Sequence, residues 1–264
     1  MSDTLNSASA KPVRTGCKRV WCREGVPPER MIEALTQPGE VLKTSKKSAV
    51  RRVGRCVIKE STERGLAALI KQTFRGARYR RAWPAARFLE EHGIGVPAAW
   101  AFIEHGFMGI VWRRTLISEY LDGFRNVEQF LATLIQQGAG HDTLALFFDA
   151  MADAVNAFSA SGAFHEDLSG KNLFTRDGQH FRFIDLDAVV IGVEYSLEKR
   201  MLNHIQLYDS FCDQVSDHLL VPFITRMLPP GQDPRVWMPK VRKGQKARRL
   251  RTEKKWAKQG KLLG

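Results

Sequence analysis

The stretch that decides the fold is Phe164 to Asp187, FHEDLSGKNLFTRDGQHFRFIDLD. Its pattern predicts a short loop, a β-hairpin and a second loop. We expect strands at 173–175 and 180–184, because Asp177-Gly178 between them is a strong turn signal. The hairpin delivers Asp185 at its end. Polar residues before and after the hairpin should therefore return to one edge of a site.

Three residues of this stretch, His165, Asp167 and Asn172, fit H-x-D-x-x-x-x-N, the pattern of the protein-kinase catalytic loop. Phosphoryl transfer needs positioned charges more than covalent chemistry. Asp167 is placed to accept the proton of an attacking hydroxyl. Asn172 and Asp185 offer the oxygen ligands that Mg²⁺ prefers. The alternative is a polar surface loop beside an ordinary hairpin, and the following I-D-L-D argues against it. His165 is expected to hold the loop together rather than carry a proton.

A candidate nucleotide contact lies upstream, where three short strands are predicted at 41–43, 49–53 and 55–59. The third strand ends in Val-Ile-Lys, so Lys59 matches the kinase lysine that grips the α- and β-phosphates. The alternative is a solvated lysine at a strand end. The preceding turn has no G-x-G-x-x-G, so backbone N–H groups and Lys46 or Lys47 would have to cover the phosphates.

Further elements are predicted from periodicity and from Gly and Pro positions. Two basic helices should fill 65–92, with Pro84 in the first turn of the second. The strand ending at Tyr120 runs into Leu-Asp-Gly, the position of a kinase hinge. There the backbone carbonyl of Glu119 and backbone groups of Leu121 would hold the adenine edge. The remaining predictions are strands at 98–103, 108–112 and 114–120, with turns at 104–106 and 113, and helices at 127–138, 196–212 and 216–227, plus one capped by Asp142.

Composition limits the class of protein. The 264 residues, 44% of them hydrophobic, suffice for one large domain or two small lobes. No run reaches the roughly 18–20 apolar residues of a membrane span, and the first residues form no apolar signal segment. The four cysteines have no disulfide or zinc spacing, so free thiols are expected. A soluble cytoplasmic protein follows from these patterns.

The basic charge is concentrated at the C-terminal end. The net charge is +13, and Glu253 is the only acidic residue among twelve basic ones from Arg235 onward. Such an excess suggests an anionic partner: a phosphorylated substrate, an acidic membrane surface or nucleic acid. Pro229-Pro230-Gly231 is expected to end the packed part. The tail beyond it would form a helix on an acidic surface or stay solvated.

In this order the motifs resemble the lipopolysaccharide core kinases, the Kdo/heptose kinase family, over about Val41 to Met227. The resemblance rests on Cys-Val-Ile-Lys, Ala-Arg-Tyr-Arg-Arg-Ala-Trp at 77–83, Gly-Ile-Gly-Val-Pro at 93–97, Ser-Glu-Tyr-Leu-Asp-Gly, His-Glu-Asp-Leu with Asn172, and Ile-Asp-Leu-Asp. It implies an α+β, two-lobed protein-kinase-like fold with a small β-rich N-lobe and a mainly helical C-lobe. The expected parts are an N-terminal segment, partly disordered, at 1–39, an N-lobe at 40–120, a C-lobe at 121–232 and a basic tail at 233–264.

The resemblance also implies an activity, namely ATP-dependent phosphorylation of a Kdo or heptose hydroxyl of the lipopolysaccharide inner core. Asp167 would be the catalytic base, Asn172 and Asp185 the Mg²⁺ ligands, and Lys59 the phosphate contact. Two departures matter. Ala82 stands where some core kinases place the glutamate that pairs with the lysine, and Glu90 and Glu91 lie two turns further on, so the partner of Lys59 stays open. Glu166 replaces the usual loop arginine and no A-P-E motif follows, which favours a small-molecule or glycolipid kinase.

Other functions remain open at this point. The chain could phosphorylate another small alcohol or act as an atypical Ser/Thr kinase. A pseudokinase, or a binding module using its basic tail on RNA or membrane, is the alternative of another class. The expected partners are a glycolipid or small sugar substrate and, through the tail, an anionic membrane surface. Nucleic acid is not expected as a partner. The expected location is the cytoplasm, peripheral at the inner face of the cytoplasmic membrane.

Overall fold

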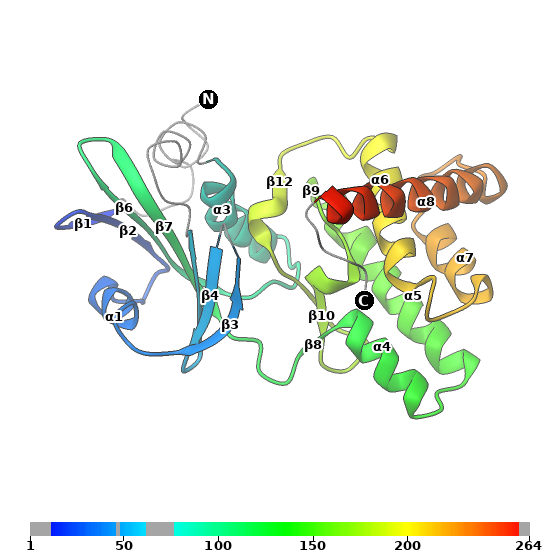
Figure 1. The fold of residues 1–264 in the computed structure, drawn as a ribbon, viewed down its shortest axis with the longest axis horizontal. Coiled ribbons are helices and arrows are strands. Elements are labelled where there is room, and N and C mark those ends of the chain that lie inside the picture. Colours follow the sequence, from blue (N-terminus) through cyan, green and yellow to red (C-terminus); the bar gives the residue numbers. More distant parts are fainter. Residues whose placement is uncertain (1–11, 46–47, 62–76, 259–264) are drawn as a thin grey trace. The chain divides into compact units, whose positions relative to one another are not determined.

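The computed structural model describes residues 12–45, 48–61 and 77–258, and it divides into two compact units. The first unit comprises Met1–Asp122 and Ile184–Ile191, and the second comprises Gly123–Phe183 and Gly192–Gly264. Figure 1 labels helices and strands of both units. The first is built on a sheet and the second on helices, which confirms the predicted α+β class with a β-rich N-terminal part and a helical C-terminal part.

The first unit contains a seven-stranded antiparallel sheet of order β1-β2-β6-β7-β5-β4-β3. Its strands are β1 (Val13–Thr15), β2 (Lys18–Cys22), β3 (Glu40–Thr44), β4 (Ser48–Val53), β5 (Cys56–Ser61), β6 (Ala99–Phe107) and β7 (Ile110–Glu119). The three strands predicted between residues 41 and 59 are confirmed as β3, β4 and β5. Because β5 pairs with β4 on one side and β7 on the other, Lys59 has a fixed place inside the sheet.

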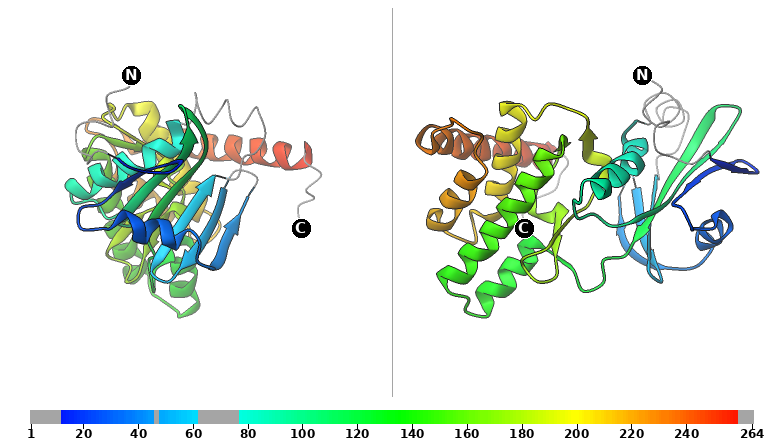
Figure 2. Two further views of the ribbon diagram at one scale, coloured as in Figure 1. Left: turned by 90° about the vertical axis from the view of Figure 1, so that its left-hand side faces the viewer. Right: turned by 180° about the vertical axis from the view of Figure 1, so that it is seen from behind.

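The next two strands form one long hairpin, where the sequence predicts three short strands. β6 and β7 run side by side (Figure 2), and the chain turns at Met108-Gly109, both with positive φ. The turns predicted at 104–106 and Arg113 are wrong. Gly106 lies inside β6, where the register shifts. Glycine is needed at this position because a Cβ would come within 2.5 Å of the Ile110 carbonyl oxygen. A strand glycine can mark such a close approach as well as a turn.

One face of this sheet holds an apolar core that includes the short helix α1 (Pro28–Ala34). Met31 and Ala34 of α1 pack with Ile58, Ile103 and Ile117 of the sheet. The chain that follows α1 is bound to β4, because the guanidinium of Arg51 donates to the carbonyl oxygens of Leu35 and Gln37. Helix and sheet are therefore joined by apolar packing and by these hydrogen bonds.

A buried carboxylate links the sheet to helix α3 (Ala77–Glu91). The side chain of Glu104 on β6 is fully buried and pairs with Arg80 at 2.8 Å, Arg114 at 2.9 Å and Arg19 at 2.6 Å. Burial alone would raise the pKa of Glu104, but the hydrogen bonds from Arg80 and Arg114 outweigh it and lower this pKa. The carboxylate therefore stays charged inside the unit.

Helix α3 runs through Pro84 without ending. The prediction that Pro84 lies in the first turn of a second helix is wrong, because the helix begins seven residues earlier. Proline removes one backbone hydrogen bond, yet the buried Trp83, Ala86 and Leu89 hold the helix in place. The helix predicted around Leu66 to Phe74 lies outside the described residues. α3 packs on the 3₁₀ turn η2 (Leu186–Ala188) and on β12 (Val189–Ile191), which belong to the same unit.

The second unit is mainly helical, with a small antiparallel sheet of order β11-β10-β8. Its elements are β8 (Arg125–Asn126), α4 (Val127–Gln136), α5 (His141–Ala160), β9 (Ala163–His165), η1 (Gly170–Asn172), β10 (Leu173–Thr175), β11 (Phe181–Phe183), α6 (Leu197–Phe211), α7 (Asp217–Arg226) and α8 (Pro234–Lys258). Phe148 of α5, Phe211 of α6 and Phe223 of α7 meet in the core. The prediction that Asp142 caps α5 is wrong, because the N-cap residue is Gly140 and Asp142 lies in the first turn of the helix.

The packed part does not end at Pro229-Pro230-Gly231, so that prediction is wrong. Helix α8 follows and packs on α6 and α7 (Figure 1). Trp237, Met238 and Val241 are buried. The indole N–H of Trp237 donates to Nδ1 of His204 on α6 at 3.0 Å. The prediction of a solvated tail fails because the apolar face of α8 is short and the rest of the helix is strongly basic, a pattern typical of a solvated segment.

Candidate active site

The predicted hairpin is confirmed, and it lies in the second unit. β10 and β11 pair with Leu173 opposite Phe183. The second strand, Phe181–Phe183, is shorter than the predicted 180–184. Oδ1 of Asp177 accepts hydrogen bonds from the backbone N–H groups of Gln179 and His180, and Gly178 has φ +78°. The side chain of Asp177 therefore closes the turn that the D-G pair predicts.

The loop before the hairpin brings Asp167 and Asn172 together. The amide nitrogen of Asn172 donates to the main-chain carbonyl oxygen of Asp167 at 2.8 Å. The same nitrogen lies 3.4 Å from Oδ2 of the Asp167 carboxylate. Nδ1 of His165 accepts from the N–H of Asp167 at 3.1 Å, and the His165 side chain is fully buried. His165 thus holds the loop, the role expected from its position. The carboxylate of Asp167 is half exposed, at 48%.

Side chains of helix α6 support this loop through hydrogen bonds to the loop's main chain. Asn203 donates to the carbonyl oxygen of His165 at 2.8 Å. Gln206 accepts from the N–H of Leu168 and donates to the carbonyl oxygen of Glu166, both at 2.8 Å, and Ser210 accepts from the N–H of Gly170. The sequence gives no sign of these contacts, because polar residues on a helix are usually read as its solvated face.

Lys59 and Asp185 come together in the first unit. Nζ of Lys59 lies 2.5 Å from Oδ1 of Asp185 and also bonds Oδ1 of Asp187. Burial alone would lower the pKa of Lys59, but the charges of Asp187 and Asp185 outweigh it and raise the pKa above its usual value. Burial, together with the charge of Asp185, raises the pKa of Asp187. Asp185 itself has φ +59°, an uncommon backbone conformation for a residue other than glycine.

Asp187 has no assigned role in the kinase motifs, although it stands in I-D-L-D. The two glutamates considered as partners of Lys59 bind elsewhere, since Glu90 pairs with Arg23 at 3.0 Å and Glu91 lies 3.9 Å from Arg87. The second Asp of I-D-L-D was the available signal, two residues after a predicted metal ligand.

The hinge candidates Glu119 and Leu121 lie where the first unit ends. The N–H of Glu119 donates to the carbonyl oxygen of Ala98 at 2.8 Å, and the N–H of Tyr120 donates to that of Arg55. Gly123, with φ +75°, begins the second unit. The adenine contacts expected of Glu119 and Leu121 stay a prediction.

The candidate residues thus form two sets, Lys59 with Asp185 in the first unit and Asp167 with Asn172 in the second. Within residues 12–45, 48–61 and 77–258, no three His, Cys, Asp or Glu side chains gather as they would around a metal ion. A kinase site would not need such a cluster, because an amide oxygen and nucleotide phosphates complete the ligands of Mg²⁺. Among the helices that the structure describes, none could cross a bilayer.

A β-rich unit carrying a strand lysine, and a helical unit carrying the H-x-D-x-x-x-x-N loop, define a kinase-like phosphotransferase. The comparison with family models identifies it further, because residues 40–214 match the lipopolysaccharide kinase (Kdo/WaaP) family. The chain belongs to this family. It is therefore a kinase, as expected from the sequence, and its place in lipopolysaccharide biosynthesis follows from the family.

Solved structures show the same fold at low sequence identity. A structure of WaaP in complex with acyl carrier protein matches with a TM-score of 0.66 and 19% identity, covering 86% of this chain and 98% of that one. A crystal structure of WbdD matches with a TM-score of 0.52 and 18% identity. That match covers 86% of this chain and 51% of WbdD, which another matching structure describes as a bifunctional kinase-methyltransferase. No curated protein sequence matches the chain.

Proposed function

We propose that the protein transfers the γ-phosphoryl group of ATP to a Kdo or heptose hydroxyl of the lipopolysaccharide inner core. The observation that carries this proposal is the loop in which Asn172 and His165 hold Asp167, in a chain of the lipopolysaccharide kinase family. This family points to a sugar acceptor. It does not distinguish Kdo from heptose, so the acceptor is part of the proposal.

Asp167 is proposed as the base. As the acceptor oxygen bonds to the γ-phosphorus, the hydroxyl proton passes to the Asp167 carboxylate and ADP leaves with the bridging oxygen. A half-exposed carboxylate suits this role because the acceptor must reach it from solvent. Asn172 holds the main chain of Asp167 and approaches the carboxylate itself at 3.4 Å. A positioned base of this kind contributes about 10²–10⁴-fold to a rate.

Lys59, Asp185 and Asn172 are proposed to hold Mg·ATP. The donors fit the ion, since the carboxylates of Asp185 and Asp187 meet at the Lys59 ammonium and carboxylate oxygens are ligands that Mg²⁺ prefers. Bound Mg²⁺ would neutralise charge on the phosphates. Lys59 would contact the α- and β-phosphates, and its ion pair with Asp187 would help to aim it. Backbone groups of Glu119 and Leu121 would hold the adenine.

The acceptor is proposed to be an anionic glycolipid at a membrane surface. The net charge of +13 supports this, because basic side chains near such a surface each contribute about 1 kcal/mol. Exposed lysines and arginines of α8 belong to the same unit as Asp167. Peripheral association with the inner face of the cytoplasmic membrane is part of this proposal.

The test is phosphate transfer from labelled ATP to purified acceptors, one ending in Kdo and one extended by heptose. Wild type should label one of them, and Asp167→Asn should lose about 10²–10⁴-fold in kcat while still binding Mg·ATP. His180→Gln, an exposed substitution on the same hairpin, serves as the control and should keep full activity. Equal activity of the Asp167 variant and wild type would refute the assignment of the base, and labelling of neither acceptor would refute the substrate class.

A further inference from the structure

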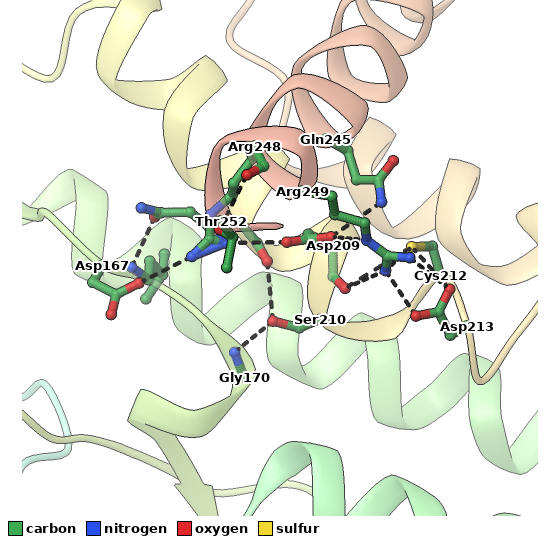
Figure 3. A network of polar contacts seen from close by, with 12 residues as sticks. Asp167, Gly170, Asp209, Ser210, Cys212, Asp213, Gln245, Arg248, Arg249 and Thr252 are labelled. Carbon is green, nitrogen blue, oxygen red and sulfur yellow. Dashed lines mark hydrogen bonds and ion pairs between the residues drawn. The ribbon is translucent and has the colours of Figure 1, made fainter. Parts of the chain in front are cut away.

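Arg248 of helix α8 lies between two carboxylates of the second unit. Its Nη1 donates to Oδ2 of Asp209 at 3.1 Å, while its Nη2 lies 3.5 Å from Oδ1 of Asp167 (Figure 3). Charge-assisted hydrogen bonds are usually about 2.7–2.9 Å long. The contact with Asp167 is therefore a loose one, and the guanidinium is anchored on Asp209 rather than on the proposed base.

Asp209, which anchors Arg248, is itself held by several donors. Nε of Arg249 donates to Oδ1 of Asp209 at 2.7 Å, and Nε2 of Gln245 donates to the same oxygen at 3.1 Å. Arg249 is fixed in turn by Asp213 at 2.8 Å. Figure 3 shows Gln245, Arg248 and Arg249 of α8 around Asp209, with Arg248 the nearest of the three to Asp167. A side chain placed by such a network loses little entropy when it takes up a ligand.

The exposed fractions of Arg248 and Asp167 leave room for a ligand. The Arg248 side chain is 35% exposed and that of Asp167 is 48% exposed. A guanidinium has five N–H donors, and the two contacts described above engage one on each terminal nitrogen. Its planar fork matches the oxygens of a phosphate or carboxylate. An anchored, half-exposed arginine beside a catalytic base is therefore suited to bind an oxyanion there.

We propose that Arg248 binds an oxyanion of the reacting pair next to the hydroxyl that Asp167 deprotonates. The oxyanion belongs either to the phosphoryl group in transfer or to an acidic group of the acceptor sugar. This inference rests on the proposed function, because it takes Asp167 as the base. It gives the basic helix α8 a defined role at the reacting atoms, in addition to any general attraction to an anionic surface.

The kinetic test compares Arg248→Ala and Arg248→Lys with Arg242→Ala. Arg242 is a matched control because it lies on the same helix, is 40% exposed and pairs with Asp217 at 2.8 Å. Loss of one preorganised oxyanion donor costs about 10²-fold or more in kcat/KM, so Arg248→Ala should fall by that factor. Arg248→Lys should recover part of it, since it keeps the charge without the fork. Arg242→Ala, which removes the same charge from α8, should fall by far less.

Hydrolysis of ATP without acceptor separates the two sources of the oxyanion. If Arg248 binds the transferred phosphoryl group, Arg248→Ala slows hydrolysis and transfer together and leaves the acceptor KM unchanged. If it binds the acceptor, KM for the acceptor rises and hydrolysis is unchanged. An Arg248→Ala variant with the kinetics of Arg242→Ala in both assays overturns the inference, while phosphate transfer by wild type leaves the proposed function standing.

A binding measurement keeps the inference testable if no acceptor is phosphorylated. The Nε–H resonance of Arg248 in ¹⁵N-labelled full-length protein is assigned by its loss in Arg248→Lys. We expect it to shift on addition of a non-hydrolysable Mg·ATP analogue or of micelles of lipid A carrying Kdo. A shift without turnover would support the oxyanion site while the proposed function fails. A resonance that neither probe moves would overturn the inference.

Discussion

At the residue scale, the most informative contact is the one between Lys59 and Asp187. Protein-kinase motifs place a glutamate on a helix as the partner of the strand lysine, and this chain has Ala82 before Trp83. Among the residues that the structure describes, Lys59 pairs with Asp185 and Asp187, which follow the hairpin. The proposed metal ligand Asp185 and its neighbour Asp187 therefore both take part in positioning the lysine.

Replacing Asp187 by Asn should weaken the binding of the nucleotide phosphates by Lys59. The amide keeps the shape of the side chain but removes a negative charge that pairs with the Lys59 ammonium. We expect KM for ATP to rise by about tenfold, which corresponds to about 1.4 kcal/mol. The measurement is a steady-state titration of Mg·ATP at saturating acceptor. Glu194→Gln, at an exposed position in the second unit, is the control, and an unchanged KM in the Asp187 variant would remove the assigned role.

Most candidate residues were accessible from sequence because their motifs are local. Asp167 and Asn172 are five positions apart, and Asp177-Gly178 defines the hairpin that follows them. Arg248 was not accessible in this way, since it lies 81 positions from Asp167. Gly106 shows the opposite error, because sequence alone cannot tell a glycine required by close backbone approach from one in a turn.

At the element scale, α8 depends on α6 for its position. Trp237 donates to Nδ1 of His204, so this nitrogen must be unprotonated in the folded state. Burial, reinforced by the charge of Arg200, lowers the pKa of His204 to about 3. A histidine that stays neutral when folded makes the attachment of the helix sensitive to acid.

The pH dependence of stability should therefore include a contribution from His204. The unfolded histidine titrates near pH 6.5, so between that pH and about 3 the unfolded state binds more protons and stability falls as pH falls. From pH 8 to pH 5 the loss from this group is about 2 kcal/mol. Urea unfolding across this range should show a smaller loss in His204→Gln, which can still accept from Trp237.

The control for this measurement is His141→Gln, because His141 is exposed at the start of α5. This variant should show the same dependence of the free energy of unfolding on pH as wild type. If the His204 variant also kept that dependence, the histidine would not stay neutral on folding and the reading of its hydrogen bond would be wrong.

At the scale of the whole molecule, the dominant feature is positive charge. On α8, several basic side chains are exposed and point into solvent: Arg235, Lys240, Lys243, Lys246, Arg251 and Lys254. If the acceptor is an anionic glycolipid, the acceptor KM should rise several-fold as salt increases from 50 to 500 mM, because the Debye length shrinks to a few ångströms. Kinetics on mixed vesicles would measure this effect.

The double variant Lys243→Glu and Lys246→Glu should raise the acceptor KM already at low salt. Its KM for a neutral, soluble sugar acceptor should stay as in wild type. A KM that responds neither to salt nor to these charges would mean that the basic surface does not recruit the acceptor, and another role would have to be found for it.

The way α6 supports the catalytic loop has an evolutionary consequence. Asn203, Gln206 and Ser210 bond the backbone of the loop, so their contacts do not depend on which side chains the loop carries. The loop can therefore exchange side chains that the chemistry does not use, with its course preserved by a separate element. Selection for a new acceptor can act on the loop while selection for its shape acts on α6, and the two can diverge at different rates.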